Sequence, residues 1–318
     1  MKILYNARIY TLDAQLPVVA ALAIEQGQIL AVGDEALNLA EGNPACEKQD
    51  LAGKTIWPGL TDAHLHLEHY AFSLQKIDCE TATRAECLRR VAERARQQPA
   101  GEWILGHGWN QNNWPEGYGS AADLDSVAPH HPVFLTAKSL HAAWVNSAAL
   151  QRADIGPHTP DPPDGKMDRD AGGKPTGILF ESAIQLVQQA LPEPDADQAA
   201  QAIRAAQPQL WQWGLTGVHD FDQRRCLVAL QMLHQNDELH LRVLKGIPLE
   251  DLPHAVELGI RSGLGDDTLR IGPVKLFADG ALGTRSAAML EPYENDRPDN
   301  QGMLFLEAEQ IFAYGQTA

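Results

Sequence analysis

The fold is decided by residues 57–67, which read Trp57-Pro58-Gly59-Leu60-Thr61-Asp62-Ala63-His64-Leu65-His66-Leu67. Side chains two residues apart point to the same face of a β-strand. In a strand here, His64 and His66 project together with Asp62, and the apolar residues between them pack behind. Two imidazoles at the end of a strand can hold one divalent metal ion. The alternative is a strand whose polar residues face solvent or are satisfied in a core, and the His-x-His pattern alone leaves both interpretations open.

The segment resembles the first barrel strand of the amidohydrolase superfamily, in which a Pro-Gly pair precedes an Asp-x-His-x-His motif. Residues 58–66 match that pattern at every constrained position. Three further segments resemble the YtcJ-like branch of the superfamily, and they follow the order of that branch along nearly the whole chain. They are Gly106-His107-Gly108-Trp109-Asn110-Gln111-Asn112-Asn113-Trp114, Ser139-Leu140-His141-Ala142-Ala143-Trp144-Val145-Asn146-Ser147 and Val274-Lys275-Leu276-Phe277-Ala278-Asp279-Gly280-Ala281-Leu282-Gly283-Thr284-Arg285.

Composition narrows the class of protein. The 318 residues can bury a large core in one or two domains, and the formal net charge of −17 argues against nucleic-acid binding. The four cysteines show no CxxC spacing, so we expect reduced thiols and a cytoplasmic location. The N-terminus lacks a signal-peptide core, and no apolar run approaches the roughly 20 residues that a membrane span needs.

The order of strands and helices predicts an α/β protein. Residues 1–55 are rich in short strands, with a hairpin turn at Gln26-Gly27, and the resemblance implies that they form part of a small β-sandwich. Residues 56–67 are the first barrel strand. Residues 68–190 form an inserted α+β subdomain, in which Thr83 and Glu86 fit the capping box of a helix.

Residues 191–318 alternate between strand and helix, which indicates a parallel sheet. With the resemblance, this alternation predicts a TIM-like (β/α)8 barrel. We can identify four barrel strands, beginning near residues 56, 215, 241 and 271, and the resembled family has further metal ligands on later strands. We therefore expect half a barrel whose open sheet edge makes the chain aggregation-prone or homodimeric, and which is catalytically incompetent when expressed alone.

Lys275 lies between two apolar residues near the end of the fourth of these strands. Burial of its amine should lower the pKa and make the neutral form accessible. The resemblance implies that Lys275 carries a carbamate that bridges two metal ions, which makes His64, His66 and Lys275 the expected metal ligands. The alternative is a lysine that reaches solvent or pairs with Asp279.

The remaining candidate residues follow the three YtcJ-like segments. His141 and Asp279 are the expected catalytic residues. The resemblance implies that His141 faces the pocket, whereas a histidine considered alone at this position is more often a hydrogen-bonded structural residue. Arg285 could hold a substrate carboxylate or pair with an acidic surface residue, and Glu181 could face the site or lie at a helix start. The expected substrate-binding residues are His107, Trp109, Asn146, Glu181 and Arg285.

Together with these residues, the resemblance implies a metal-dependent amidohydrolase that acts on a small molecule. The expected cofactor is one or two divalent metal ions, with zinc as the first choice. The metal would activate a water molecule for attack on a carbon–nitrogen bond other than a peptide bond. Amide, N-acyl and formamide substrates all fit. One alternative is another His-x-His metal hydrolase, such as a phosphoesterase, and a second is an inactive fragment or binding remnant of such an enzyme.

Overall fold

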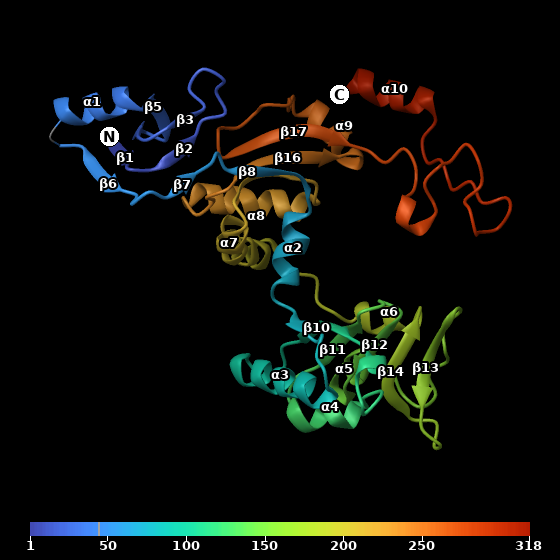
Figure 1. The fold of residues 1–318 in the computed structure, drawn as a ribbon. Coiled ribbons are helices and arrows are strands. Elements are labelled where there is room, and N and C mark those ends of the chain that lie inside the picture. The colour runs from blue at the N-terminus through green and yellow to red at the C-terminus, as the bar shows by residue number, and fades with distance from the viewer. Residues whose placement is uncertain (44) are drawn as a thin grey trace. The chain divides into compact units, whose positions relative to one another are not determined.

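The computed structural model describes residues 1–43 and 45–318, which divide into two compact units (Figure 1). The first unit contains residues 1–62 and 210–217, and the second contains residues 63–209 and 218–318. Both β8 (Leu60–Leu65) and β15 (Leu215–Asp220) begin in the first unit and end in the second. The four-part domain division expected from the sequence stays a prediction.

Short strands build two small sheets in the first unit. One has the order β5-β4-β1-β6 and the other β3-β2-β7. The strands are β1 (Lys2–Tyr5), β2 (Arg8–Tyr10), β3 (Val18–Val19), β4 (Leu22–Glu25), β5 (Gln28–Val32), β6 (Glu47–Asp50) and β7 (Thr55–Ile56). The hairpin turn predicted at Gln26-Gly27 is confirmed, since β4 and β5 pair antiparallel on either side of it.

Helix α1 (Asp34–Gly42) packs on the first of these sheets. Its alanines Ala36 and Ala40 join Ile3, Ala23 and Ala31 in a small apolar core. This helix was not predicted from the sequence. Gly33 precedes it without any side-chain cap, so the usual signal for a helix start is missing.

Gly59 explains why the Pro-Gly pair precedes β8. A Cβ atom added at Gly59 would lie 2.0 Å from Oγ1 of Thr216 on β15. The Leu60 N–H also donates a hydrogen bond to the Gly214 carbonyl at 2.8 Å, immediately before β15. Close approach of the backbone therefore requires glycine at the entry to the histidine-bearing strand.

A six-stranded sheet with the order β13-β14-β12-β11-β10-β9 organises residues 77–181 of the second unit. Its strands are β9 (Ile77–Asp78), β10 (Ile104–Trp109), β11 (Val133–Ala137), β12 (Ala142–Val145), β13 (Gly165–Arg169) and β14 (Pro175–Glu181). The associated helices are α3 (Arg84–Gln97), η1 (Gln111–Asn113), α4 (Ala121–Val127), α5 (Ser147–Arg152) and α6 (Ala183–Gln188). The capping box expected at α3 is confirmed in part, because the Thr83 side chain accepts a hydrogen bond from the Glu86 N–H.

Alternation along these strands separates two apolar cores. Leu135 and Trp144 pack into a core with α3 and α4, whereas their neighbours Phe134 and Val145 pack into another with α5 and α6. The period of two is that of a sheet covered by helices on both faces. This part of the chain is thus a three-layer α/β/α structure (Figure 1).

A second sheet in this unit combines the carboxyl-terminal ends of β8 and β15 with β16 (Arg242–Pro248) and β17 (Leu269–Lys275), in the order β17-β16-β15-β8. β16 and β17 pair in parallel, as the strand–helix alternation predicts. The other elements of this unit are α2 (Leu67–Ser73), α7 (Ala196–Gln212), α8 (Arg224–Gln235), η2 (Leu249–Asp251), α9 (Leu252–Glu257), η3 (Leu282–Thr284) and α10 (Ala308–Thr317). The last three residues of α7 belong to the first unit.

The expected fold class is therefore confirmed as mixed α/β. All four predicted barrel strands lie in one sheet, but the described residues form no closed barrel. None of the helices in the described part of the chain combines the length and apolar composition that a bilayer crossing requires.

Candidate active site

The two histidines of the 57–67 segment lie at the carboxyl end of β8, where the chain turns into α2. His64 and His66 are exposed, and their ring centroids are 5.8 Å apart. The structure thus brings this predicted pair together at a strand end.

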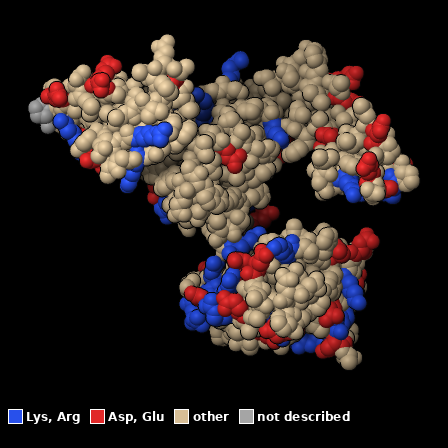
Figure 2. Space-filling view, viewed as in Figure 1, with Lys and Arg blue, Asp and Glu red and all other residues tan. Residues whose placement is uncertain are grey.

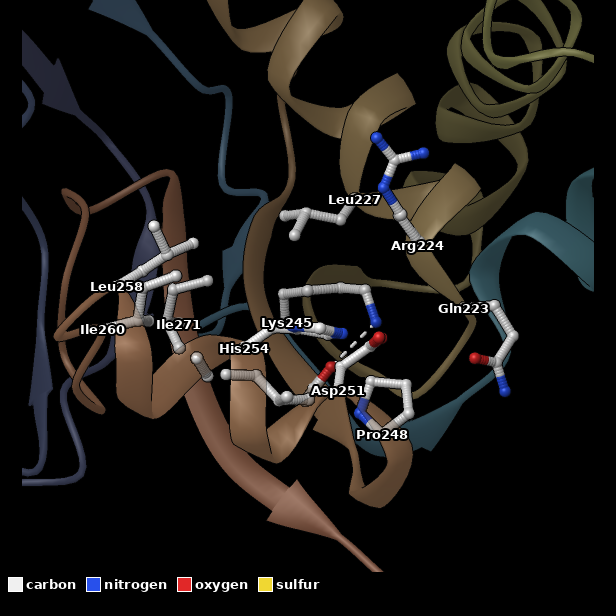
Figure 3. Close-up of a pocket in the computed structure, with 13 residues that line it drawn as sticks. Gln223, Arg224, Leu227, Lys245, Pro248, Asp251, His254, Leu258, Ile260 and Ile271 are labelled. Atoms are coloured by element: carbon white, nitrogen blue, oxygen red, sulfur yellow. Dashed lines mark hydrogen bonds between the residues drawn. The ribbon is translucent and has the colours of Figure 1, made fainter.

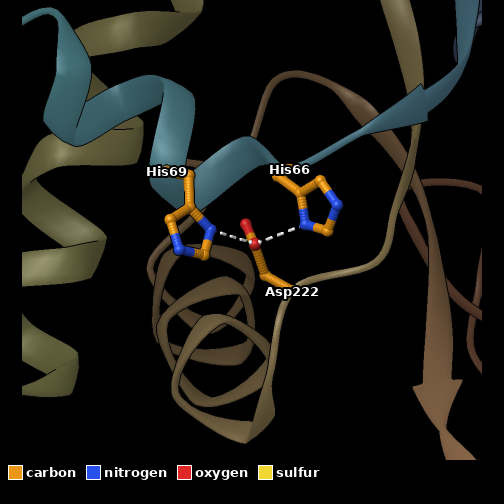
Figure 4. A group of neighbouring side chains, drawn as sticks. All are labelled: His66, His69 and Asp222. Carbon is orange, nitrogen blue, oxygen red and sulfur yellow. Dashed lines mark hydrogen bonds and ion pairs between the residues drawn. The ribbon is translucent and has the colours of Figure 1, made fainter. Parts of the chain in front are cut away.

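A buried carboxylate fixes one of the two rings. His66 Nδ1 lies 2.9 Å from Asp222 Oδ1, and His69 Nδ1 lies 2.6 Å from the same oxygen (Figure 4). His66, His69 and Asp222 offer ligand atoms that all lie within 4.8 Å of one another, close enough to hold a metal ion. Neither His69 nor Asp222 was predicted from the sequence. Asp222 is 156 residues from His66, and tertiary structure alone joins the two. The sequence did contain one signal for this site. Asp220 is the last residue of the short apolar strand β15, and Asp222 follows it.

Asp220 and Asp222 experience different electrostatic environments although both are buried. Burial raises the pKa of Asp220 above its usual value, even though the Lys245 ammonium lies 3.1 Å away and opposes the rise. Burial also acts to raise the pKa of Asp222, but hydrogen bonds from His69, His66 and the Glu68 N–H outweigh it and hold that pKa below its usual value. Folding thus shifts the pKa values of the two carboxyl groups in opposite directions, and the lowered pKa of Asp222 favours its ionised form as an acceptor of hydrogen bonds.

Lys245 and Arg225 neutralise the buried acids around the histidines. The Lys245 ammonium is fully buried and donates to the backbone carbonyls of Asp222 and Gly246. Arg225 on α8 pairs with the buried Glu68 on α2, with Nε at 2.9 Å from the carboxylate. These contacts lock α2 to the loop that carries Asp222, because charges removed from water remain stable only when they are paired.

Lys275 ends β17 as predicted, and its surroundings are aromatic. Its Nζ lies 5.4 Å from the ring centroid of Phe221 and 4.9 Å from that of Phe277. His64 packs against the same Phe221 ring at 4.7 Å. Within residues 1–43 and 45–318 no carboxylate lies within 4.0 Å of this ammonium group, so the alternative pairing with Asp279 does not form.

Gly246 allows Phe221 to occupy this position. A Cβ atom added at Gly246 would lie 2.7 Å from the Phe221 ring. The ring therefore contacts β16 closely and stands next to both His64 and Lys275. Two of the three predicted metal ligands thus share one aromatic neighbour.

His141 and Glu181 are also brought together. His141 Nδ1 lies 2.9 Å from Glu181 Oε2, and both side chains are exposed. The backbone of Glu181 is left-handed, with φ of 50°, as is that of Leu140 next to His141, with φ of 65°. Non-glycine residues adopt this conformation rarely, and its cost is tolerated more often at functional sites.

His107 lies within β10 and lines a cavity of about 350 Å³ together with Thr136 and Leu140. Its Nδ1 is 2.9 Å from the Thr136 hydroxyl. Asp279 is partly exposed, and its Oδ2 accepts a hydrogen bond from the Ala288 N–H at 2.9 Å. Arg285 pairs with Asp296 at 3.5 Å, which corresponds to the surface pairing that the sequence left open.

Trp109 and Asn146 have packing roles in the structure. Trp109 is fully buried, and its indole N–H donates to the Leu135 carbonyl at 2.8 Å. Asn146 is also fully buried, and its side chain caps α5. Both side chains are thus part of the packed core, and the substrate contacts expected of them from the sequence stay a prediction.

A further cavity of about 280 Å³ lies between α8, α9 and the strands β16 and β17. Leu258, Ile260 and Ile271 gather at one end of it, and Gln223 and Arg224 lie at the other (Figure 3). None of the site residues predicted from the sequence lines this cavity.

The comparisons with known proteins agree with the sequence motifs. The model of the amidohydrolase family matches residues 47–316. YtcJ of Bacillus subtilis strain 168 is 34% identical over 313 residues, which are 95% of this chain and 58% of YtcJ. The N-substituted formamide deformylase of Arthrobacter pascens is 38% identical over 223 residues, which are 68% of this chain and 41% of that enzyme.

A solved structure covers the whole chain. The crystal structure of an uncharacterized metal-dependent hydrolase from Pyrococcus furiosus superimposes with a TM-score of 0.77 at 30% identity, covering 100% of this chain and 64% of that one. The chain thus spans about half the length of the curated relatives it matches. Because the family model matches most of its residues, the chain belongs to the amidohydrolase family.

Proposed function

We propose that the chain acts as a metal-dependent hydrolase of a carbon–nitrogen bond outside peptides, of the amide, N-acyl or formamide type. The observation that carries the proposal is His66, an exposed imidazole whose Nδ1 contacts a buried carboxylate. Histidines that bind metal almost always donate their other ring N–H to such a group. The names of the formamide deformylase and of the Pyrococcus hydrolase support both the bond type and the metal.

The residues at the strand ends fit a divalent ion. His64 and His66 would supply imidazole nitrogens, and a carbamate on Lys275 would supply an oxygen, a donor set that suits zinc. His64 and Lys275 both adjoin Phe221, which supports their action at one place. A bound ion would polarise a substrate carbonyl and lower the pKa of a water molecule.

The chain's other groups have proposed roles around that chemistry. Glu181 accepts a hydrogen bond from His141 Nδ1, which leaves Nε2 of His141 to orient a substrate carbonyl. One carboxylate oxygen of Asp279 accepts a hydrogen bond from the Ala288 N–H. The other oxygen would exchange a proton with the leaving nitrogen of the substrate. The four free cysteines support a cytoplasmic location.

The test combines metal content with substrate class. We expect the purified chain to bind zinc, to lose it when His64 and His66 are both replaced by Ala, and to keep it in the control variant His130→Ala, which changes an exposed histidine in a turn. Zinc-dependent turnover of N-formyl or N-acyl amines would support the proposed hydrolase, and it would contradict the catalytic incompetence expected from the sequence. Turnover of phosphate esters alone would identify a phosphoesterase, and unchanged zinc in the double variant would reject the ligand assignment.

One observation favours a second candidate function. Among the described residues, the four strands β8, β15, β16 and β17 form a four-stranded sheet rather than a closed barrel. A chain of this kind could bind metal and ligand without turnover. Stoichiometric zinc together with no hydrolysis of any substrate in the panel would identify that binding remnant.

A further inference from the structure

Asp222 lies at the centre of a buried hydrogen-bond network. Its side chain is 1% exposed. One oxygen, Oδ1, accepts from His66 Nδ1 at 2.9 Å and from His69 Nδ1 at 2.6 Å, and the other, Oδ2, accepts from the Glu68 N–H at 2.6 Å (Figure 4). Both oxygens are thus directed at the corner where β8 turns into α2.

A second carboxylate keeps Asp222 free for the imidazoles. Asp220 accepts hydrogen bonds from the backbone N–H groups of Leu67 at 2.8 Å and of Asp222 at 3.1 Å. It also forms the ion pair with the buried Lys245. Because Asp220 takes the ammonium group and two backbone donors, Asp222 keeps one oxygen for the two histidine rings.

We propose that Asp222 is a positioning residue, which holds His66 and His69 in the tautomer protonated on Nδ1 and leaves both Nε2 atoms free to accept a ligand. An ionised carboxylate accepts hydrogen bonds and donates none, so each ring must present Nδ1–H to it. The metal-binding consequence for His66 rests on the proposed function, but the tautomer itself does not.

The distances favour hydrogen bonds over direct metal binding by Asp222. Two ligand atoms that each lie about 2.0–2.1 Å from a tetrahedral zinc ion are roughly 3.3 Å apart. The two N···O separations of 2.9 and 2.6 Å are shorter and match charge-assisted hydrogen bonds. The second carboxylate oxygen of Asp222 accepts a hydrogen bond from the Glu68 N–H, as is usual for a carboxylate that orients a histidine ligand.

The experiment observes the ring nitrogens directly. Imidazole nitrogens of the metal-free chain are recorded by long-range ¹H–¹⁵N correlation above the titration range of histidine, and His66→Gln and His69→Gln assign the signals. We expect His66 and His69 protonated on Nδ1 in the unmodified chain. In Asp222→Ala we expect both rings to redistribute toward protonation on Nε2.

Another histidine–carboxylate pair provides the matched control. His234 Nε2 lies 2.7 Å from Asp266 Oδ2, so Asp266→Ala should alter the His234 signals and leave His66 and His69 unchanged. If Asp222→Ala does not fold, Asp222→Asn provides the second variant. It keeps the side-chain volume but has a single acceptor oxygen, whereas the carboxylate uses one oxygen for the two histidines and the other for the Glu68 N–H. At least one contact must then be lost, so a change in the His66, His69 or Glu68 N–H signal is expected.

Zinc addition separates this proposal from the proposed function. We expect zinc to shift Nε2 of His66 in the unmodified chain, and Asp222→Ala to weaken zinc binding by about 10–100-fold. Three results would each overturn the positioning role. They are protonation of His66 on Nε2 in the unmodified chain, histidine tautomers that stay unchanged in a folded Asp222→Ala variant, and a zinc-induced shift of Nδ1 in place of Nε2. Tautomers that depend on Asp222 in a chain that binds no zinc would uphold positioning and reject the proposed function.

Discussion

Asn146 connects three backbone segments through a single buried amide. Its side-chain oxygen accepts from the Val133 N–H at 2.9 Å and from the Ala149 N–H at 3.0 Å. Its side-chain nitrogen donates to the carbonyls of Ala128 and His131, at 3.4 and 2.8 Å. The residue thus caps α5 and also ties β11 to the turn before it.

We expect Asn146→Ala to lower the free energy of unfolding by about 3 kcal/mol, since it removes a helix cap and leaves buried backbone groups unpaired. Urea denaturation followed by circular dichroism measures the loss. Asn112→Ala, at an exposed site, is the control and should stay within about 0.5 kcal/mol. Equal stability of the two variants would reject the capping role.

The residues of the candidate site differ in how well a sequence can reveal them. His64 and His66 could be grouped because a strand places them two positions apart on one face. Their metal role stays a prediction. The sequence could not assign Asp222 and Lys245 to the same site as His66, because only the pairing of β8, β15 and β16 brings the three residues together. Lys245 interrupts an apolar strand much as Lys275 does, so a search for lysines within strands would have found both.

Among the helices, α3 has ion pairs between side chains three and four residues apart. Glu86 accepts hydrogen bonds from Arg89 at 2.8 Å and from Arg90 at 3.2 Å. Acidic and basic side chains are accordingly interspersed on the surface that contains α3 (Figure 2). The bonds from Arg89 and Arg90 lower the pKa of Glu86 to about 2.

That shift gives a signed pH dependence. A carboxyl group whose pKa is lowered by folding stabilises the folded state above its unfolded pKa, and this contribution is lost as the pH falls toward the folded value. We expect the Glu86 contribution to be complete above about pH 4.5 and to vanish toward pH 2. Denaturation of the native chain and of Glu86→Gln across this range measures it, and the variant should show a flatter profile. A Glu86 titration near pH 4.5 in the folded chain would contradict the expectation.

Elements with a strong local pattern could be predicted, and those without one could not. The helix at α3 and the hairpin at Gln26-Gly27 follow from capping and turn residues. The strand β12 was missed because all four of its residues are buried, so it lacks alternation between apolar and polar positions. The break between β1 and β2 has no apolar or polar pattern to announce it, and Asn6 in this break adopts a left-handed conformation with φ of 54°.

At the scale of the whole molecule, the second unit leaves many large apolar side chains in solvent. They include Phe277, Leu282, Leu290, Phe305 and Phe312 between β17 and the end of α10, and Leu290 is 97% exposed. Soluble monomers rarely expose apolar surface in contiguous patches of more than a few hundred Å². This segment is therefore the expected site of self-association.

We expect the chain to form dimers or larger assemblies as its concentration rises. Light scattering after size-exclusion chromatography measures the mass. The double variant Leu290→Ser with Phe312→Ser should shift the chain toward monomer, whereas Leu12→Ser, at an exposed position in the first unit, should not. A monomer at every concentration would contradict this prediction.

The architecture could be predicted at the level of class and strand order. Strand–helix alternation after residue 191 indicates parallel pairing, and β16 and β17 pair in that way. The spatial order β17-β16-β15-β8 follows the sequence order of these strands, which makes the sheet one of the simplest to infer. The closed barrel came from the resemblance rather than from pattern, and the described residues do not form it.

The aromatic cluster in the core next to α3 and α4 gives the chain an internal optical probe. Trp109 and Trp114 are stacked at 6.0 Å, and Trp144 meets Trp114 edge to face at 5.8 Å. Because these indoles are shielded from water, their fluorescence should be blue-shifted and resistant to iodide. Trp57 and Trp213 in the first unit are 59% and 57% exposed, so their emission should be quenched readily. Quencher-resolved spectra recorded during denaturation would therefore follow the melting of each unit separately, without any added label.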